Sequence, residues 1–322
     1  MKKILSSPKL QRKLYELKVA KDLMSAAADP YRPLLAQIVI TRRCNLSCGY
    51  CFEYDKVSKP VALDILKARI DELKRLRVVF VTLNGGEPLL HPERVELVRY
   101  IRELGMTPMI NSNGFALKPK LIKELNEAGL FGIQISCDGL TQNEVSEKTM
   151  DRLLPKLEML AKYAEFRVRV NTVLGSCPPK EAIEVAKIVT DLGFDAQCSL
   201  VRDEHGSAMI LDEATQEAYM AIRAMQGRLP TFLNDNFQLP LVRGEEIKWK
   251  CRSGARYFHV DENGIVHLCQ PRAGFPGKPI EEYQVEDIKS CFHMHKPCSK
   301  RCPHAYAHIG SRMDGFRHQN IS

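Results

Sequence analysis

The sequence predicts an α/β fold of six strand–helix units followed by a small cysteine-rich module. Three observations support this prediction. Strand-like apolar runs and amphipathic helical segments alternate between residues 34 and 225. Polar motifs follow four consecutive strand-like runs, as expected where the carboxyl ends of parallel strands share one edge. After about residue 245 the alternation stops, and five of the eleven cysteines follow.

The elements of the alternating part follow from their apolar spacing. Strand-like runs are short and rich in β-branched residues, and we expect them at 35–40, 78–83, 108–111, 132–136, 167–172 and 196–201. Helical segments repeat apolar residues at spacings of three and four, and we expect them at 63–73, 95–104, 119–128, 150–163, 181–192 and 213–225. Strict alternation implies parallel strands with right-handed crossovers, arranged as an open sheet or a barrel.

The N-terminal segment, residues 1–30, is expected to form a basic amphipathic helix. Seven of its first 25 residues are Lys or Arg, and helical spacing relates Leu10, Leu14, Leu17 and Leu23. We expect a solvated helix that packs across the bottom of the main domain, although its charge also permits weak contact with a membrane surface. The basic residues lack the aromatic interleaving of nucleic-acid surfaces, so no nucleic-acid partner is expected.

The composition bounds the class of protein. The chain has 322 residues, 44% of them apolar and 27% charged, with a net charge of +8, which is typical of a globular domain. No apolar run approaches the roughly 20 residues of a membrane helix, and no secretory signal precedes the first strand. We therefore expect a cytoplasmic protein whose cysteines are thiols or metal ligands rather than disulfides.

The remaining segments are expected to be a main domain at 31–227, a linker at 228–244 and the cysteine-rich module at 245–322. Prolines, asparagines and a glycine mark the linker. In the module, the turn Asp-Glu-Asn-Gly at 261–264 separates two β-branched runs at 256–260 and 265–269, which predicts a hairpin. A short helix is expected near 285–294.

Three cysteines after the first strand form the most informative motif. Cys44, Cys48 and Cys51 have the spacing C-x3-C-x2-C, which suits three thiolates around one iron–sulfur cubane. Three ligands leave one iron of a [4Fe–4S] cluster without a protein ligand, and this iron can bind the amino and carboxylate groups of S-adenosylmethionine (SAM). The alternative is a zinc site.

This motif and its companions resemble the radical SAM superfamily over roughly residues 34–205. Gly85-Gly86-Glu87-Pro88 matches the superfamily's GGEP motif, in which glycines allow close approach to the ligand and Glu87 accepts a hydrogen bond from its amino group. The resemblance implies a partial (β/α)6 barrel. It also implies SAM contacts at strand ends and beside the last cysteine, namely Tyr50, Gly85, Gly86, Glu87, Asn113, Ser136 and Asn171.

The C-terminal module resembles the twitch or SPASM-type extension that holds auxiliary clusters. The hairpin brings Cys269 and Cys251 to one open end, and Cys298 and Cys302 supply a second pair, which makes four candidate ligands for an auxiliary [4Fe–4S] cluster. Full SPASM modules carry seven cysteines, so one auxiliary cluster is expected here. Cys291 is the spare cysteine, although it can replace Cys298 or Cys302. The alternative is a zinc knuckle, and His304 and His308 are expected at the surface.

The resemblance implies an enzyme that cleaves SAM reductively to a 5′-deoxyadenosyl radical, which abstracts hydrogen from a substrate. A reductant such as flavodoxin or ferredoxin is implied. Related enzymes modify peptides, small molecules or protein side chains; the short segment before the first strand argues against a leader-peptide domain. Residues for catalysis on the substrate are not identified. Two alternatives remain: a non-catalytic scaffold that binds zinc or an iron–sulfur cluster, and a radical SAM enzyme that acts on a lipid-like substrate.

Overall fold

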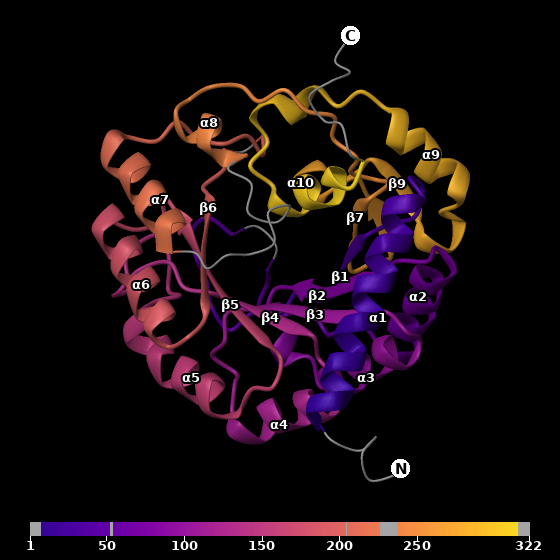
Figure 1. Cartoon of the computed structure of the whole chain (residues 1–322), viewed down its shortest axis with the longest axis horizontal. Coiled ribbons are helices and arrows are strands. Elements are labelled where there is room, and N and C mark those ends of the chain that lie inside the picture. Colours follow the sequence, from indigo (N-terminus) through magenta and orange to yellow (C-terminus); the bar gives the residue numbers. More distant parts are fainter. Residues whose placement is uncertain (1–7, 52–53, 204, 226–236, 315–322) are drawn as a thin grey trace.

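The computed structural model describes residues 8–51, 54–203, 205–225 and 237–314. Its main part is a curved layer of parallel strands with helices packed on the outer face (Figure 1). The strands of this layer are β1 (Leu35–Thr41), β2 (Phe80–Gly85), β3 (Thr107–Ser112), β4 (Gly132–Ser136), β5 (Arg167–Leu174) and β6 (Asp195–Leu200). The helices are α2 (Leu63–Arg75), α3 (Arg94–Glu103), α4 (Pro119–Glu127), α5 (Met150–Tyr163), α6 (Pro179–Asp191) and α7 (Glu213–Met225).

The alternating pattern therefore predicts the fold class correctly. All five pairings within the series β1 to β6 are parallel, and neighbours in the chain are neighbours in the sheet. Each helix buries its apolar positions at spacings of three and four against the strands, as Leu66, Ile70 and Leu73 of α2 do. The sheet is not closed, which agrees with a partial barrel.

The C-terminal hairpin continues the same sheet. β7 (Tyr257–Val260) pairs in parallel with β1, and β8 (Ile265–His267) and β9 (Pro276–Pro279) follow antiparallel, so the sheet has nine strands among the described residues. Asp261 accepts hydrogen bonds from the amides of Asn263 and Ile265 and so fixes the expected turn. The cysteine-rich module therefore shares its hydrogen bonding with the barrel.

Three further helices complete the C-terminal part: α8 (Gln238–Val242), α9 (Val285–His293) and α10 (Ala305–Arg312). The expected linker at 228–244 falls partly outside the described residues. Its described end is packed, because Leu241 and Val242 of α8 are buried in the main core. α10 packs against β7, near the open side of the curved sheet (Figure 1).

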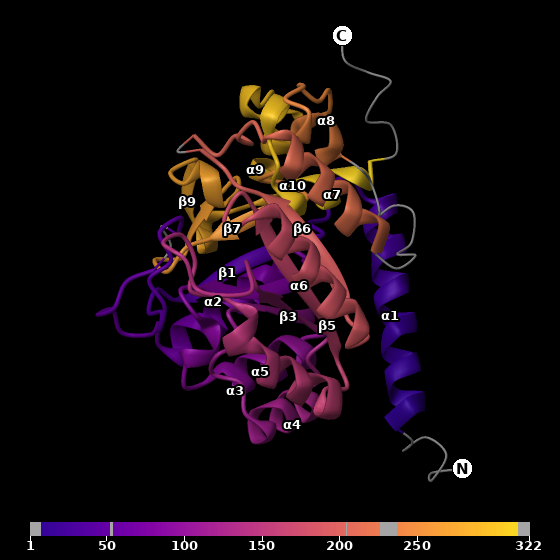
Figure 2. The same cartoon turned by 90° about the vertical axis from the view of Figure 1, so that its left-hand side faces the viewer.

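Helix α1 (Pro8–Ala28) crosses the amino ends of the strands, as expected for a helix at the bottom of the domain (Figure 2). Tyr15 stacks edge-on against Phe131, before β4, and Lys18 donates to the carbonyl of Gly105, before β3. The expected apolar face is wrong in its middle part, whereas Leu23 packs against the core at Ala26 and the side chain of Leu10 lies outside what the structure describes. Leu14 and Leu17 are 50% and 60% exposed, whereas Val19 and Ala26 are buried.

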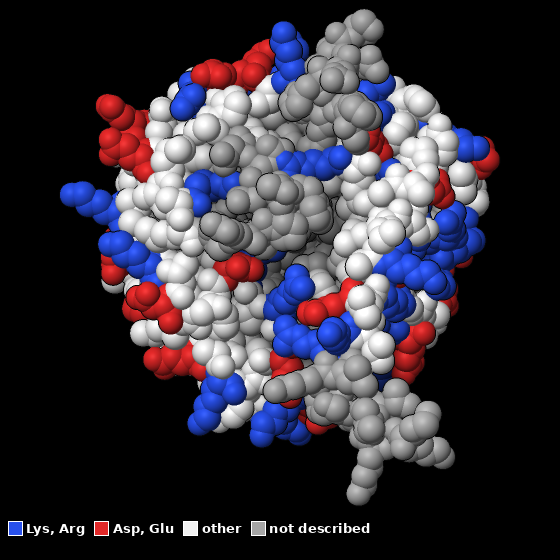
Figure 3. Space-filling view, viewed as in Figure 1, with Lys and Arg blue, Asp and Glu red and all other residues white. Residues whose placement is uncertain are grey.

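The leucine spacing of α1 is a poor guide to its buried face, because polar and cation–π contacts hold much of this helix against the domain. One such contact places Arg102 over the ring of Tyr15. Lys and Arg side chains gather along the band that α1 occupies on the face shown in Figure 3. None of the described helices combines the length and apolarity that crossing a bilayer requires.

One buried arginine joins the two ends of the described chain. Arg256 is 1% exposed, and its guanidinium donates to the carbonyls of Ala26, Asp29 and Arg32 and to the carboxylate of Asp314. A charge at this depth is stable because each of the three guanidinium nitrogens donates to an acceptor.

Replacing Arg256 by glutamine is therefore expected to lower the free energy of unfolding by about 3–5 kcal/mol, because it leaves Asp314 and three carbonyls short of a donor. Urea unfolding measures this change. The control is Arg77→Gln, because the Arg77 side chain is 59% exposed and pairs with Asp29 at the surface. We expect about 1 kcal/mol or less for the control. Equal losses in the two variants would contradict the role given to Arg256.

Candidate active site

The three N-terminal cysteines lie on the loop that follows β1 and line one end of a large cavity. Cys48 is buried, and Cys44 and Cys51 are half-buried. The amide of Leu46 donates to Sγ of Cys44 at 3.4 Å, and Nδ2 of Asn113 reaches the same sulfur at 3.7 Å. Such N–H···S contacts stabilise thiolate ligands of iron–sulfur clusters. The loop therefore suits an anionic cluster.

Gly85 and Gly86 hold this loop in place by steric fit. A Cβ on Gly86 would lie 2.3 Å from the carbonyl oxygen of Arg42, and one on Gly85 would lie 2.0 Å from that of Thr41. Gly85 also has φ of +138°, which favours glycine. The end of β2 thus contacts the backbone just before Cys44 more closely than any side chain would allow. Both glycines also line the cavity.

The carboxylate of Glu87 is placed differently from our expectation. It is 0% exposed and does not line the cavity among the described residues. Its oxygens accept hydrogen bonds from the amides of Leu89 and Asn113 and from the hydroxyl of Ser112. Burial raises the pKa of this carboxyl, and the three donors oppose that rise. Glu87 therefore joins the end of β2 to the end of β3, which places Asn113 beside Cys44.

A buried polar network anchors the other side of the loop. The hydroxyl of Tyr50 donates to Asp138, whose carboxylate is 0% exposed and also accepts from Ser146. Lys148 contacts both Tyr50 and Asp138. Burial alone would lower the pKa of Lys148, but the neighbouring Asp138 and Tyr50 raise it, so this lysine is a fixed cation. It interacts electrostatically with Cys48.

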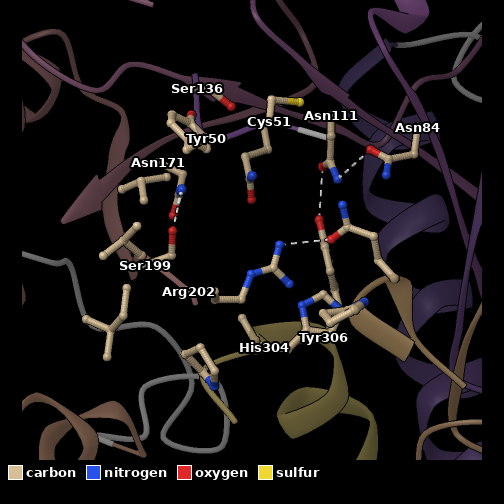
Figure 4. A pocket seen from close by; sticks show the side chains of 18 of the residues that line it. Tyr50, Cys51, Asn84, Asn111, Ser136, Asn171, Ser199, Arg202, His304 and Tyr306 are labelled. Carbon is tan, nitrogen blue, oxygen red and sulfur yellow. Dashed lines mark hydrogen bonds between the residues drawn. The ribbon is translucent and has the colours of Figure 1, made fainter. Parts of the chain in front are cut away.

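The cavity occupies the inside of the curved sheet and has a volume of about 820 Å³. Its wall is polar, because each strand from β1 to β6 contributes an inward-facing amide or guanidinium. These residues are Gln37, Asn84, Asn111, Gln134, Arg169 and Gln197. Asn113, Ser136 and Asn171 line the same cavity nearer the cysteine loop, and Asn171 donates to Ser199 (Figure 4). The predicted SAM contacts other than Glu87 are thus brought together.

The four predicted auxiliary ligands also come together. Cys269 interacts electrostatically with Cys251, Cys298 and Cys302, and it belongs with Cys251 to a buried cluster against which Cys302 packs. Burial raises the pKa of Cys302 to about 12, so only a bound cation would keep such thiols ionised. Arg272 hydrogen-bonds Cys298. Cys291 lies elsewhere, since its sulfur accepts from Tyr283 and contacts Gly254.

The expectation that His304 and His308 lie at the surface is wrong. His308 is 2% exposed and its ring is stacked between Phe237 and Trp249. His304 lines the cavity and hydrogen-bonds the hydroxyl of Tyr257, and burial lowers its pKa well below the usual value. Helix α10 and its N-cap therefore place His304, Tyr306 and His308 in the wall of the cavity.

Both cysteine groups offer the thiol donors that iron–sulfur clusters take, three on one loop and four in the C-terminal part. Among the side chains that the structure describes, no three of His, Cys, Asp or Glu converge as required to hold a single metal ion. Zinc needs four ligands at about 2–2.3 Å from one point. A cubane distributes its thiolates over separate irons, so they stand further apart, which is compatible with three cysteines along one loop.

Fold and site together define an α/β enzyme with a cysteine loop at the carboxyl ends of a parallel partial barrel. The sequence profile of the radical SAM superfamily matches residues 38–201, and the chain belongs to this superfamily. Membership favours an enzyme over the non-catalytic scaffold.

Named relatives place the chain among diverse radical SAM proteins. It is 28% identical over 169 residues to an AdoMet-dependent heme synthase of Methanosarcina barkeri, covering 50% of this chain and 48% of the synthase. It is 25% identical over 269 residues to a PqqA peptide cyclase of Bradyrhizobium diazoefficiens, covering 77% of this chain and 70% of the cyclase. The chain thus spans about half of the first relative.

A solved structure supports the fold. Streptococcus suis SuiB bound to precursor peptide SuiA matches with a TM-score of 0.66 and 15% identity, covering 90% of this chain and 74% of SuiB. The match extends beyond the residues of the superfamily profile and so includes much of the C-terminal part.

Sequence reasoning missed the polar wall of the cavity. The inward residues occupy alternate positions of the strands, as Gln134 and Ser136 do on β4 and Arg169 and Asn171 on β5. Alternation of polar with apolar residues inside short buried strands was the available signal. Tyr306 and Arg202 lie outside the strands and carried no such signal.

The fit of Gly86 against the cysteine loop gives a direct test. Gly86→Ala is expected to displace the loop, because the new Cβ has backbone rather than a flexible side chain in its way. Anaerobically reconstituted protein should then lose about four irons per chain. Gly49→Ala is the matched control within the loop, since its Cβ would lie 3.4 Å from the carbonyl of Glu144. Full iron content in Gly86→Ala would contradict this account.

Proposed function

We propose that this chain binds a [4Fe–4S] cluster through Cys44, Cys48 and Cys51 and cleaves SAM at that cluster. The observation that carries the proposal is that the three thiols and six predicted SAM contacts line one cavity. When bound, the cluster supplies one electron to SAM, which yields methionine and a 5′-deoxyadenosyl radical that takes a hydrogen atom from a substrate C–H bond. The electron comes from a reductant such as flavodoxin or ferredoxin.

The side chains around the loop have separate tasks in this proposal. Asn113 and the amide of Leu46 stabilise the Cys44 thiolate. The backbone of Gly85 and Gly86 and the polar groups of Ser136 and Asn171 offer hydrogen bonds to the amino acid and ribose parts of SAM. Tyr50, held by Asp138, closes the cavity beside the last cysteine. Enclosure matters because the radical attacks most C–H bonds that it meets.

We further propose that the substrate is a peptide side chain. The PqqA peptide cyclase and SuiB, which is bound to a precursor peptide, are similar to this chain over most of its length. A cavity of about 820 Å³ is large enough to admit SAM and one or two side chains together. A small-molecule substrate is the second candidate, because the cavity is lined by polar groups from every strand of the barrel.

A second cluster at Cys251, Cys269, Cys298 and Cys302 completes the proposal. These four residues do not line the cavity among the described residues, but Gln270 and Pro303, the chain neighbours of Cys269 and Cys302, do. A cluster bound by these four cysteines would accept the electron that the substrate radical loses when the substrate is oxidised. Such a position suits oxidation or cross-linking, in which the substrate radical loses one more electron.

Replacing Cys44, Cys48 and Cys51 together by alanine is expected to abolish the release of 5′-deoxyadenosine with dithionite and to remove about four irons per chain. Chromatography of the reaction mixture and iron analysis measure both. Cys177→Ala is the control, because Cys177 lies outside both cysteine groups beside Glu181. Cleavage that persists in the triple variant would refute the proposed function.

Replacing Cys251 and Cys269 together by alanine is expected to remove about four irons while leaving the first cluster's spectrum with SAM intact. Cys291→Ala is the matched control, because Cys291 is buried like Cys251 and Cys269 but accepts a hydrogen bond from the hydroxyl of Tyr283. Electron paramagnetic resonance of reduced protein, with and without SAM, separates the two clusters. An iron loss in Cys291→Ala as large as in the double variant would contradict the assignment of ligands.

A further inference from the structure

The cavity is rich in positive charge and poor in acidic groups. Arg169, Arg202, Arg223 and Arg312 line it together with Lys148. Asp203 is the sole acidic residue among the described lining residues, and its carboxylate already accepts from the amides of His205 and Ser207 in a turn. Lys148 has a partner in Asp138, so the excess of positive charge rests on the arginines.

Among the arginines that line the cavity, Arg169 is one of two with a buried donor that has no hydrogen-bond partner. Its Nε has no hydrogen-bond partner, and its attractive interactions with Tyr306 and Asp195 are electrostatic only. It precedes Asn171 by two residues on β5, so both side chains face the cavity, with Arg169 roughly 7 Å further from the cysteine loop. Tyr306 lies near it and donates to Asn111 across the cavity.

Arg202 is the second such arginine. Its Nη2 donates to Gln270 at 3.1 Å, but its buried Nη1 has no partner. In Figure 4 this side chain extends into the middle of the cavity, near His304 and Tyr306. Arg202 also interacts electrostatically with Cys302. Arg202 thus lines the cavity and is close enough to the C-terminal cysteine group to interact with Cys302.

On the basis of the proposed function, we propose that the substrate carries an oxyanion, a carboxylate or a phosphate, which Arg169 and Arg202 bind in the part of the cavity away from the cysteine loop. Unpaired buried guanidinium donors are costly unless a ligand satisfies them. Guanidinium groups match the planar oxygens of carboxylate and phosphate with paired hydrogen bonds. The methionine carboxylate of SAM is a different anion. Its predicted contacts, such as Asn171, lie two residues nearer the cysteine loop than Arg169 does.

Calorimetry on the anaerobically reconstituted protein, saturated with SAM, tests this proposal. The probes are N-acetylglutamate and inorganic phosphate, with N-acetylglutamine as the neutral counterpart of the first. The unmodified protein should bind one of the two anions but not the neutral probe. Arg169→Gln and Arg202→Gln should each weaken that binding roughly tenfold or more. Binding of N-acetylglutamate alone indicates a carboxylate, and binding of phosphate alone indicates a phosphate.

Arg167→Gln is the matched control. Arg167 lies two residues earlier on the same strand, but its side chain is 59% exposed and pairs with Glu16 outside the cavity. Its variant should bind the probe as the unmodified protein does. Iron content and the thermal unfolding midpoint of each variant show that a loss of binding is local, and Arg169→Lys, which keeps the charge, should recover part of the affinity.

Three results would overturn the proposal: neither anion binds, the Arg169 and Arg202 variants bind as well as the control, or they lose affinity for SAM instead of the anion. The last result would assign the arginines to the SAM site. Release of 5′-deoxyadenosine by the unmodified protein, measured in the same preparation, separates this test from the proposed function. Cleavage without anion binding rejects only the oxyanion, whereas absence of cleavage rejects the proposed function itself.

Discussion

The buried carboxylate of Glu87 is the interaction on which the geometry of the site depends. It has no exposed surface, and a charge in that position is tolerable only because Leu89, Ser112 and Asn113 donate to it. Its hydrogen bonds hold the ends of β2 and β3 at a fixed separation. Gly85 and Gly86 then pack closely against the backbone that leads to Cys44, and the side-chain amide of Asn113 donates to the sulfur of Cys44. The Glu87 side chain thus links the ends of β2 and β3, and the backbone of Gly86 and Glu87 links them to the end of β1 by donating to Thr41 and Arg43.

The open barrel has a consequence for the interior. Closed parallel barrels fill their centre with branched apolar side chains, whereas this curved sheet places amides and arginines there. Such a wall contributes less to stability than an apolar core, and it is retained around a space of about 820 Å³. β7 adds to β1, and the hydroxyl of Tyr257 bridges Gln37 of β1 to His304 before α10. The C-terminal part is therefore built into the wall of the cavity.

The sequence predicts what depends on local pattern and fails where tertiary contacts decide. Six strands and their helices are recovered to within a few residues, because burial on one side leaves a clear periodicity. The face of α1 is wrong, since its position depends on polar and ring contacts such as Arg102 with Tyr15 rather than on its leucines. The role of Glu87 was also missed because it depends on tertiary contacts. The GGEP motif indicates a carboxylate at this position, but it does not indicate that the three hydrogen-bond donors to that carboxylate belong to the protein. His308 between two aromatic rings lay beyond any local signal.

A single electrostatic rule relates the three charged regions of the site. Thiolate-bound clusters are anions, and a buried anion is stable where fixed cations or donors face it. Lys148 faces Cys48 on the first loop, and Arg272 hydrogen-bonds Cys298 in the C-terminal group. Arg169 and Arg202 line the cavity and each keeps one buried donor without a hydrogen-bond partner, although Arg202 also interacts electrostatically with Cys302. The same rule applies to these two arginines, whose buried donors need an anion to accept from them. In the proposal made above, the oxyanion of the substrate is that acceptor.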